Sequence, residues 1–168
     1  QIQSLAGEKF RKVTLELGGK APQLIFPDAD LESAMPWIAM GNFYHQGQVC
    51  AAGTRVVVHE SIADQVVDGL VDFARSSVVG DPFDPASTQG TIVNRTQFDR
   101  IMGYIDKGRA EGAELVTGGG RVGDRGYFIE PTVFRGDNSL AIAREEIFGP
   151  VATVITFSDT DEAVRIAN

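Results

Sequence analysis

Apolar and polar residues follow two different spacings along the chain, and these predict strands and helices in alternation. Short runs rich in β-branched and aromatic residues predict strands at residues 12–20, 21–26, 54–60, 112–119, 127–134 (interrupted by Pro131) and 151–157. Helical spacing predicts helices at residues 31–47, 62–77, about 94–109 and 159–168, with a short helix or turn at 143–149. This alternation favours right-handed crossovers, so we expect an α/β fold with a mainly parallel sheet and helices on both faces.

Short polar side chains mark the expected starts of several helices. Asp28 or Asp30, Ser61 and Asp159 stand directly before helical runs, where their oxygens can accept hydrogen bonds from the free amides of the first turn. Residues 79–90 contain two Pro and two Gly and show no periodicity, so we interpret them as a surface loop.

The composition is that of one globular domain, and its charge argues against some partners. The chain has 168 residues, of which 43% are hydrophobic, and a formal net charge of −8. Nucleic acid is an unexpected partner, because its binding depends on Lys and Arg that neutralise phosphates. No apolar run is long enough to cross a membrane and the first residues lack the apolar core of a signal peptide, so we expect a cytoplasmic protein.

The supply of cysteine and histidine narrows the chemistry. Cys50 is the single cysteine, which excludes an internal disulfide, and with only His45 and His59 beside it we expect no metal centre. A lone cysteine is more often a small buried hydrophobe than a nucleophile, so its neighbours decide. The cation nearest to it in sequence is Arg55, which lies in a predicted strand.

Two glycine-containing loops carry reactive side chains. Glu16 precedes Gly18 and Gly19, and Cys50 stands within GQVCAAG. Active sites of open α/β sheets gather beyond the carboxyl ends of strands, where we expect both loops. A thiolate there attacks a carbonyl carbon, its amide can donate to the developing oxyanion, and a carboxylate activates the water that hydrolyses the adduct. Taken singly, Glu16 is better explained as a solvated carboxylate and Cys50 as a structural thiol.

Three motifs, read together, are more specific. LELGGK at 15–20, QGQVCAAGTR at 46–55 and EEIFGPV at 145–151 occur in one order and at workable distances. In these motifs, and over essentially its whole length, the chain resembles the aldehyde dehydrogenase superfamily. The resemblance implies oxidation of an aldehyde to a carboxylic acid with NAD or NADP, by an enzyme that is a homodimer or homotetramer when complete.

The resemblance also implies catalytic roles. Cys50 would attack the aldehyde to form a thiohemiacetal, and loss of hydride to the nicotinamide would leave a thioester. Glu16 would then act as the base for the water that releases the acid. The spacing between Glu16 and Cys50 is the one usual in hydrolytic members of the family.

Further residues are implied on the cofactor side. Glu146 resembles the residue that hydrogen-bonds the nicotinamide-side ribose, and Phe148 the one that packs beside it, although core packing is the alternative for Phe148. Gly18 is assigned to the same side. Gln97 falls where many members place another cofactor contact, and this match is looser.

Some residues near the nucleophile keep two interpretations. His45, two residues before Gly47, stands where many relatives carry Asn; it would bind substrate or tune the thiol, or it is a structural histidine at a helix end. Trp37, Phe43 and Tyr44 would line a substrate funnel, or they pack in the core.

The missing parts of the family pattern set the expected domain organisation. No G-x-G-x-x-G pattern opens a helix, and the family's second oxyanion donor, an Asn, belongs upstream of the chain. We therefore interpret residues 1–168 as a single nucleophile-bearing catalytic domain, with the cofactor-binding domain and oligomerisation segment outside it, and we expect the isolated chain to be inactive. Two alternatives are a CoA-acylating dehydrogenase, in which a thiol resolves the thioester, and a catalytically silent structural or binding domain.

Overall fold

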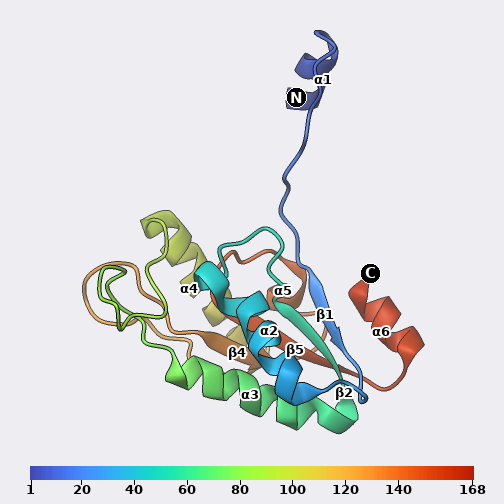
Figure 1. The fold of residues 1–168 in the computed structure, drawn as a ribbon, viewed down its shortest axis with the longest axis vertical. Helices are drawn as coiled ribbons and strands as arrows, with labels where there is room; N and C mark the ends of the chain where they lie inside the picture. The colour runs from blue at the N-terminus through green and yellow to red at the C-terminus, as the bar shows by residue number, and fades with distance from the viewer.

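The centre of the fold is a five-stranded sheet, seen in a computed structural model that describes all of residues 1–168. The strands are β1 (Pro22–Ile25), β2 (Arg55–His59), β3 (Glu114–Thr117), β4 (Thr132–Arg135) and β5 (Val151–Phe157), in the spatial order β1-β2-β5-β4-β3. All neighbours are parallel except β3, which runs antiparallel to β4 at one edge. The predicted mainly parallel α/β architecture is confirmed (Figure 1).

Helices cover both faces of this sheet. On one face lie α2 (Leu31–Phe43) and α3 (Ala63–Ser76), and on the other α4 (Arg95–Ala110), α5 (Ala141–Arg144) and α6 (Thr160–Ala167). Short 3₁₀ turns, η1 (Tyr44–Gly47) and η2 (Glu60–Ile62), follow α2 and precede α3, and α1 (Ile2–Gly7) begins the chain. None of the helices combines the length and apolar character that crossing a membrane would require.

Strand β2 shows why the sheet is covered twice. Val56 and Val58 pack into the core under α2 and α3, while Val57 between them packs against α6, and none of the three is exposed. Successive side chains of a strand point to opposite faces, so a continuous apolar run requires a hydrophobic layer on each side.

Two of the predicted helix caps are confirmed and one is wrong. Asp30 accepts from the Ser33 amide at 3.4 Å at the start of α2, and Asp159 accepts from the Glu162 amide at 2.8 Å at the start of α6. Ser61 caps no helix, because β2 runs directly into η2 and the Ser61 amide itself donates to Nδ1 of His59 at 3.2 Å.

The strand predicted at residues 12–20 is wrong. This segment has no regular secondary structure and extends away from the sheet, with α1 at its far end (Figure 1). Its alternating Leu15 and Leu17 side chains are exposed. A strand needs a neighbour for its backbone hydrogen bonds, and no other strand of the chain lies beside this segment.

Valines in two helices offer a test of where the core lies. Val66 of α3 is fully buried, whereas Val164 of α6 is 50% exposed. We expect Val66→Ala to lower the free energy of unfolding by about 2 kcal/mol, because it removes buried methyl groups and leaves a cavity. Val164→Ala should change the free energy of unfolding by less than about 0.5 kcal/mol, with both variants measured by urea titration. Equal losses in the two variants would contradict the assigned packing of α3.

Candidate active site

The three motif loops gather along the edge of the sheet that is formed by the amino-terminal ends of its parallel strands. This edge is opposite to the one expected, which is formed by the carboxyl ends. Gly18 lies before β1, Cys50 before β2 and Glu146 before β5. These strands are parallel and adjacent, with β2 in the middle, so the loops that enter them open side by side. The expectation of a site at the carboxyl ends was wrong because each motif leads into its strand rather than out of one.

The first and third motifs touch through backbone and carboxylate. The Gly19 amide donates to Oε1 of Glu146 at 3.2 Å. A Cβ atom on Gly18 would collide with the Glu146 carboxylate, so only glycine allows this approach. The structure therefore brings Gly18 and Glu146, both assigned to the cofactor side, into direct contact.

Three of the four residues that carry a side chain and have left-handed backbone lie in the second and third motifs or directly before them, and the fourth is Phe10. His45, Gln46 and Phe148 have φ angles of 51°, 57° and 60°, unusual for residues with side chains. Gly47 has a φ of 66°, and a Cβ there would collide with the carbonyl oxygen of Gly149, where the two loops meet. Strain of this kind persists where surrounding structure imposes it, and it is frequent at functional sites.

The loop that carries Cys50 is held at its far end, at Gly53, while the Cys50 thiol stays accessible. The Gly53 amide donates to the Gly41 carbonyl of α2 at 2.9 Å, and the side-chain amide of Gln23 donates to the Gly53 carbonyl at 2.8 Å. Cys50 is exposed on the turn that precedes this anchored residue, and its sulfur has no hydrogen-bond partner. The alternative interpretation, a small buried structural residue, does not describe this exposed cysteine.

Helix α4 fixes the third motif from outside. The Nε2 atom of Gln97 donates to the carbonyls of Ile147 and Phe148, both at 2.9 Å, and Arg100 donates to the Glu146 carbonyl at 2.6 Å. Gln97 thus uses its donor group to hold the backbone of this loop. Phe148 is half-buried rather than part of the core, which leaves part of its ring free.

Glu16 is the member of the site that the structure ties least. Its side chain is exposed and takes part in no hydrogen bond or ion pair. It lies two residues before Gly18, in the segment that leads to β1. That its carboxylate and the Cys50 thiol face one cleft remains a prediction, supported by the adjacency of β1 and β2.

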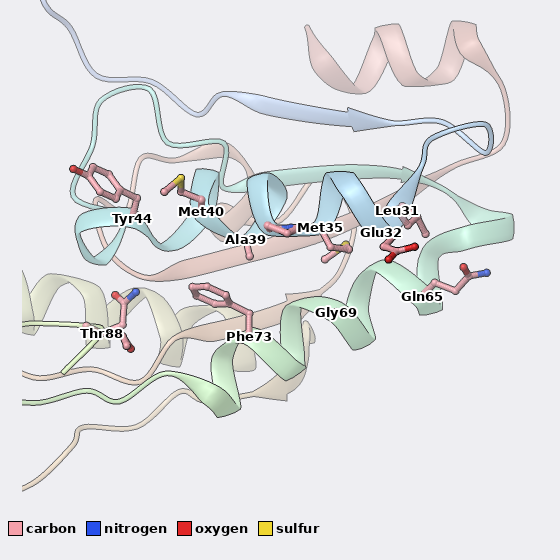
Figure 2. Close-up of a pocket in the computed structure, with 12 residues that line it drawn as sticks. Leu31, Glu32, Met35, Ala39, Met40, Tyr44, Gln65, Gly69, Phe73 and Thr88 are labelled. Carbon is pink, nitrogen blue, oxygen red and sulfur yellow. The ribbon is translucent and has the colours of Figure 1, made fainter. Parts of the chain in front are cut away.

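An apolar cavity of about 450 Å³ is lined by residues on both sides of Cys50 in the chain. It is lined by Trp37, Met40, Gly41, Tyr44, Val49, Ala51 and Ala52. Trp37 and Tyr44 are 71% and 64% exposed, whereas Phe43 is completely buried, so the funnel interpretation fits the first two and core packing fits Phe43. A larger groove of about 730 Å³ continues from Met40 and Tyr44 along the cleft between α2 and α3 (Figure 2).

Arg55 and Lys20 show what the sequence did not reveal. Arg55 points away from Cys50: it donates to the carbonyls of Lys20 at 3.1 Å and of Ile166 and Ala167, both at 2.8 Å. The Nζ atom of Lys20 is buried and has no hydrogen-bond partner. Its burial, followed by the charge of Arg55, lowers the pKa of Lys20 to about 8, against the opposing effect of Glu146.

Gln48 makes further contacts that the three motifs do not predict. Its Nε2 donates to the His45 carbonyl at 3.3 Å, and its Oε1 accepts from the Val93 amide at 3.0 Å. The side-chain amide of Gln48 therefore joins the loop that carries Cys50 to the turn η1 before it and to the loop before α4. The available signal was its place inside the second motif, three residues after His45 and two before Cys50.

The residues present fit the ribose end of a dinucleotide. The Glu146 carboxylate is half-buried, can accept further hydrogen bonds from hydroxyl groups, and lies against the bare backbone of Gly18 and Gly19. The half-buried Phe148 follows it in the same loop. No group of three or more His, Cys, Asp or Glu side chains is placed so that it could hold a metal ion.

The chain is similar to known proteins over its whole length. The family model described as "Aldehyde dehydrogenase family" matches residues 1–168. Betaine aldehyde dehydrogenases of Brucella anthropi and Brucella ovis are each 50% identical over 173 residues, which cover 100% of this chain and 36% of theirs. The chain thus spans about a third of the length of these curated relatives.

Solved structures agree in fold. Gamma-glutamyl-gamma-aminobutyraldehyde dehydrogenase of Burkholderia cenocepacia superposes with a TM-score of 0.92 at 47% identity over 99% of this chain and 34% of its own. Betaine aldehyde dehydrogenase of Staphylococcus aureus, solved in complex with NAD+, gives a TM-score of 0.90 at 39% identity, over 99% of this chain and 34% of its own.

Two glycines test the close approach between the loops. We expect Gly47→Ala to lower the free energy of unfolding by at least about 1 kcal/mol, because its left-handed backbone and the Gly149 carbonyl leave no place for a methyl group. Gly103, exposed in the middle of α4 with open space around it, is the matched control. Gly103→Ala should raise the same quantity by about 0.5–1 kcal/mol in a denaturant titration. A Gly47→Ala protein as stable as the parent would refute this packing.

Proposed function

Because the chain belongs to the aldehyde dehydrogenase family, we propose that it is the nucleophile-bearing domain of an enzyme that oxidises an aldehyde to a carboxylic acid with NAD or NADP. The observation that carries this proposal is the arrangement of three adjacent parallel strands, whose entering loops hold Glu16, Cys50 and Glu146 at one edge. Since the chain covers 36% of its curated relatives, the remaining cofactor contacts and the dimer or tetramer contacts are assigned to other parts of a longer enzyme.

Cys50 is proposed as the nucleophile. Its thiol is exposed on a turn flanked by Ala51, Ala52 and Gly53, so a substrate carbonyl can approach without meeting large side chains. Its thiolate forms a bond to the carbonyl carbon, and the carbonyl electron pair moves to oxygen to give a thiohemiacetal. The Cys50 backbone amide has no hydrogen-bond partner and is free to donate to that oxygen.

Release of the acid needs a base. The bound cofactor supplies a hydride acceptor, and loss of hydride from the former aldehyde carbon leaves a thioester on Cys50. Glu16 takes a proton from water as the water oxygen bonds to the acyl carbon, and the carbon–sulfur bond then breaks to return the thiolate. The solvated position of Glu16, in a segment without regular structure, suits a base that must receive water from solvent.

The third motif is proposed to hold the cofactor ribose. The Glu146 carboxylate would accept from its hydroxyl groups and Phe148 would pack beside it, while Gly18, which has no side chain, lets Glu146 lie against the backbone at this site. Gln97 contributes by holding the carbonyls of Ile147 and Phe148, so it acts as a positioning residue.

The cavity beside Cys50 suggests a class of substrate. Trp37 and Tyr44 offer exposed aromatic side chains there, and aromatic faces attract quaternary ammonium groups as well as apolar ones. Relatives at 50% identity are named for betaine aldehyde. We therefore include an aldehyde that carries a trimethylammonium group among the proposed substrates.

Substitution of the two reactive side chains tests the mechanism in the complete enzyme. Cys50→Ala should lower the turnover number by at least about 10³-fold, since it removes the thiolate that is proposed to attack the aldehyde. Glu16→Gln should still produce about one equivalent of reduced cofactor per site in a rapid burst and then stall as a thioester, detected by mass spectrometry. Near-normal turnover by Cys50→Ala would reject the proposal, and product release that requires CoA would identify an acylating dehydrogenase instead.

The substrate cavity is tested by a matched pair of aromatic residues. Trp37→Ala should raise KM for betaine aldehyde about 10-fold, because loss of the ring removes cation–π attraction and apolar contact. Phe83→Ala, at a residue 93% exposed and away from the cavity, should leave KM unchanged. Similar KM values in the two variants would place the substrate elsewhere.

A further inference from the structure

A buried ammonium group without a partner lies next to the proposed ribose site, and the mechanism above does not use it. The Nζ atom of Lys20 has no hydrogen-bond partner. Lys20 directly follows Gly18 and Gly19, whose backbone contacts the Glu146 carboxylate. Removing a charge from water without a partner is unfavourable, so this lysine does not owe its place to a gain in stability.

Two charged groups act on Lys20, one from each neighbouring element. Arg55 of β2 repels it, and Arg55 cannot turn aside because its guanidinium is held by carbonyls, including that of Lys20 itself at 3.1 Å. Glu146, in the loop before β5, attracts it without forming a direct ion pair. The positive charge of Lys20 in turn attracts the Glu146 carboxylate, whose Oε1 atom already accepts from the Gly19 amide.

We propose that Lys20 is a positioning residue, whose ammonium group keeps the Glu146 carboxylate oriented on the Gly18–Gly19 backbone so that its remaining lone pairs meet the cofactor ribose. This inference rests on the proposed function of Glu146. One lone pair of Oε1 is used by the Gly19 amide, and a carboxylate offers about four acceptor sites, so enough remain for a ribose diol.

A pH dependence follows from the charge of Lys20. Its pKa lies near 8 in the folded chain against an ordinary value of 10.5. As pH rises through 8, Lys20 becomes neutral, its attraction for Glu146 is lost, and cofactor binding should weaken. Stability should change in the opposite direction: the unfolded chain binds more protons between pH 8 and 10.5, so the folded state gains stability as pH rises through that range.

The binding experiment uses NAD+ as the probe in the complete enzyme, with isothermal titration calorimetry at pH 7 and pH 9. A Cys50→Ala background removes the thiol from the measurement. At pH 7, Lys20→Met should raise Kd about five-fold. Lys20→Arg keeps its charge at both pH values and should abolish the weakening that the parent shows at pH 9. Lys9→Met, the same change at an exposed lysine of the same segment, should leave Kd unchanged at both pH values.

A stability experiment separates positioning from a structural role and does not depend on cofactor. Lys20→Met should unfold at a higher urea concentration than the parent at pH 7. In a double-mutant cycle this gain should be larger in a Glu146→Gln background, where the buried ammonium group has lost the attraction of the carboxylate. Additivity in the cycle, or unchanged NAD+ affinity in Lys20→Met, would overturn the inference. If the parent itself binds no NAD+, the proposed function fails, and the cycle alone decides whether Lys20 and Glu146 are coupled.

Discussion

The parallel pairing of β1, β2 and β5 is the constraint on which the site depends. Each motif loop enters one of these strands, so their mutual register decides which residues of the three loops meet. That register is secured by burial: Val56 and Val58 fill one core and Val57 the other. A slip by one residue would reverse the faces of the whole strand, which an element buried on both sides between unlike helices does not tolerate. The relative positions of the three motif loops are therefore fixed by the packing of apolar residues in the middle of the sheet.

The loops themselves are built from backbone more than from side chains. Gly18 and Gly47 allow a carboxylate and a carbonyl to come closer than any Cβ would permit. His45, Gln46 and Phe148 accept left-handed conformations that cost energy and must be held by their surroundings. The holding groups are amides, among them Gln97 and the backbone of Gly53, which satisfy carbonyls that irregular chain would otherwise leave unpaired.

What the sequence could predict was local, and what it could not predict depended on distant partners. Asp30 and Asp159 cap helices that begin one residue later. The consecutive valines of β2 likewise indicate a strand that is buried on both faces. The alternation of residues 12–20 also looks like a strand, but the outcome depends on a pairing partner that local pattern cannot supply. The edge of the sheet that carries the site follows from the chain direction through each strand. The contacts of Gln97 with the carbonyls of Ile147 and Phe148 and of Gln48 with the Val93 amide span 45 or more residues, so local sequence does not predict their partners.

Arg55 and Lys20 illustrate why burial of a charge does not by itself reveal its purpose. Both cations lie at the same end of the sheet and both lose hydration. Arg55 recovers it through carbonyls at the end of α6, where a helix terminus favours positive charge, and so it joins the entrance of β1 to the last helix. Lys20 recovers nothing of the kind, although a four-carbon stem could have reached solvent with little cost. The Lys20 ammonium group stays buried although hydration would favour its exposure, and it directly follows Gly19, whose amide donates to the Glu146 carboxylate. Its burial is therefore explained better by its attraction for that carboxylate than by a contribution to the stability of the fold.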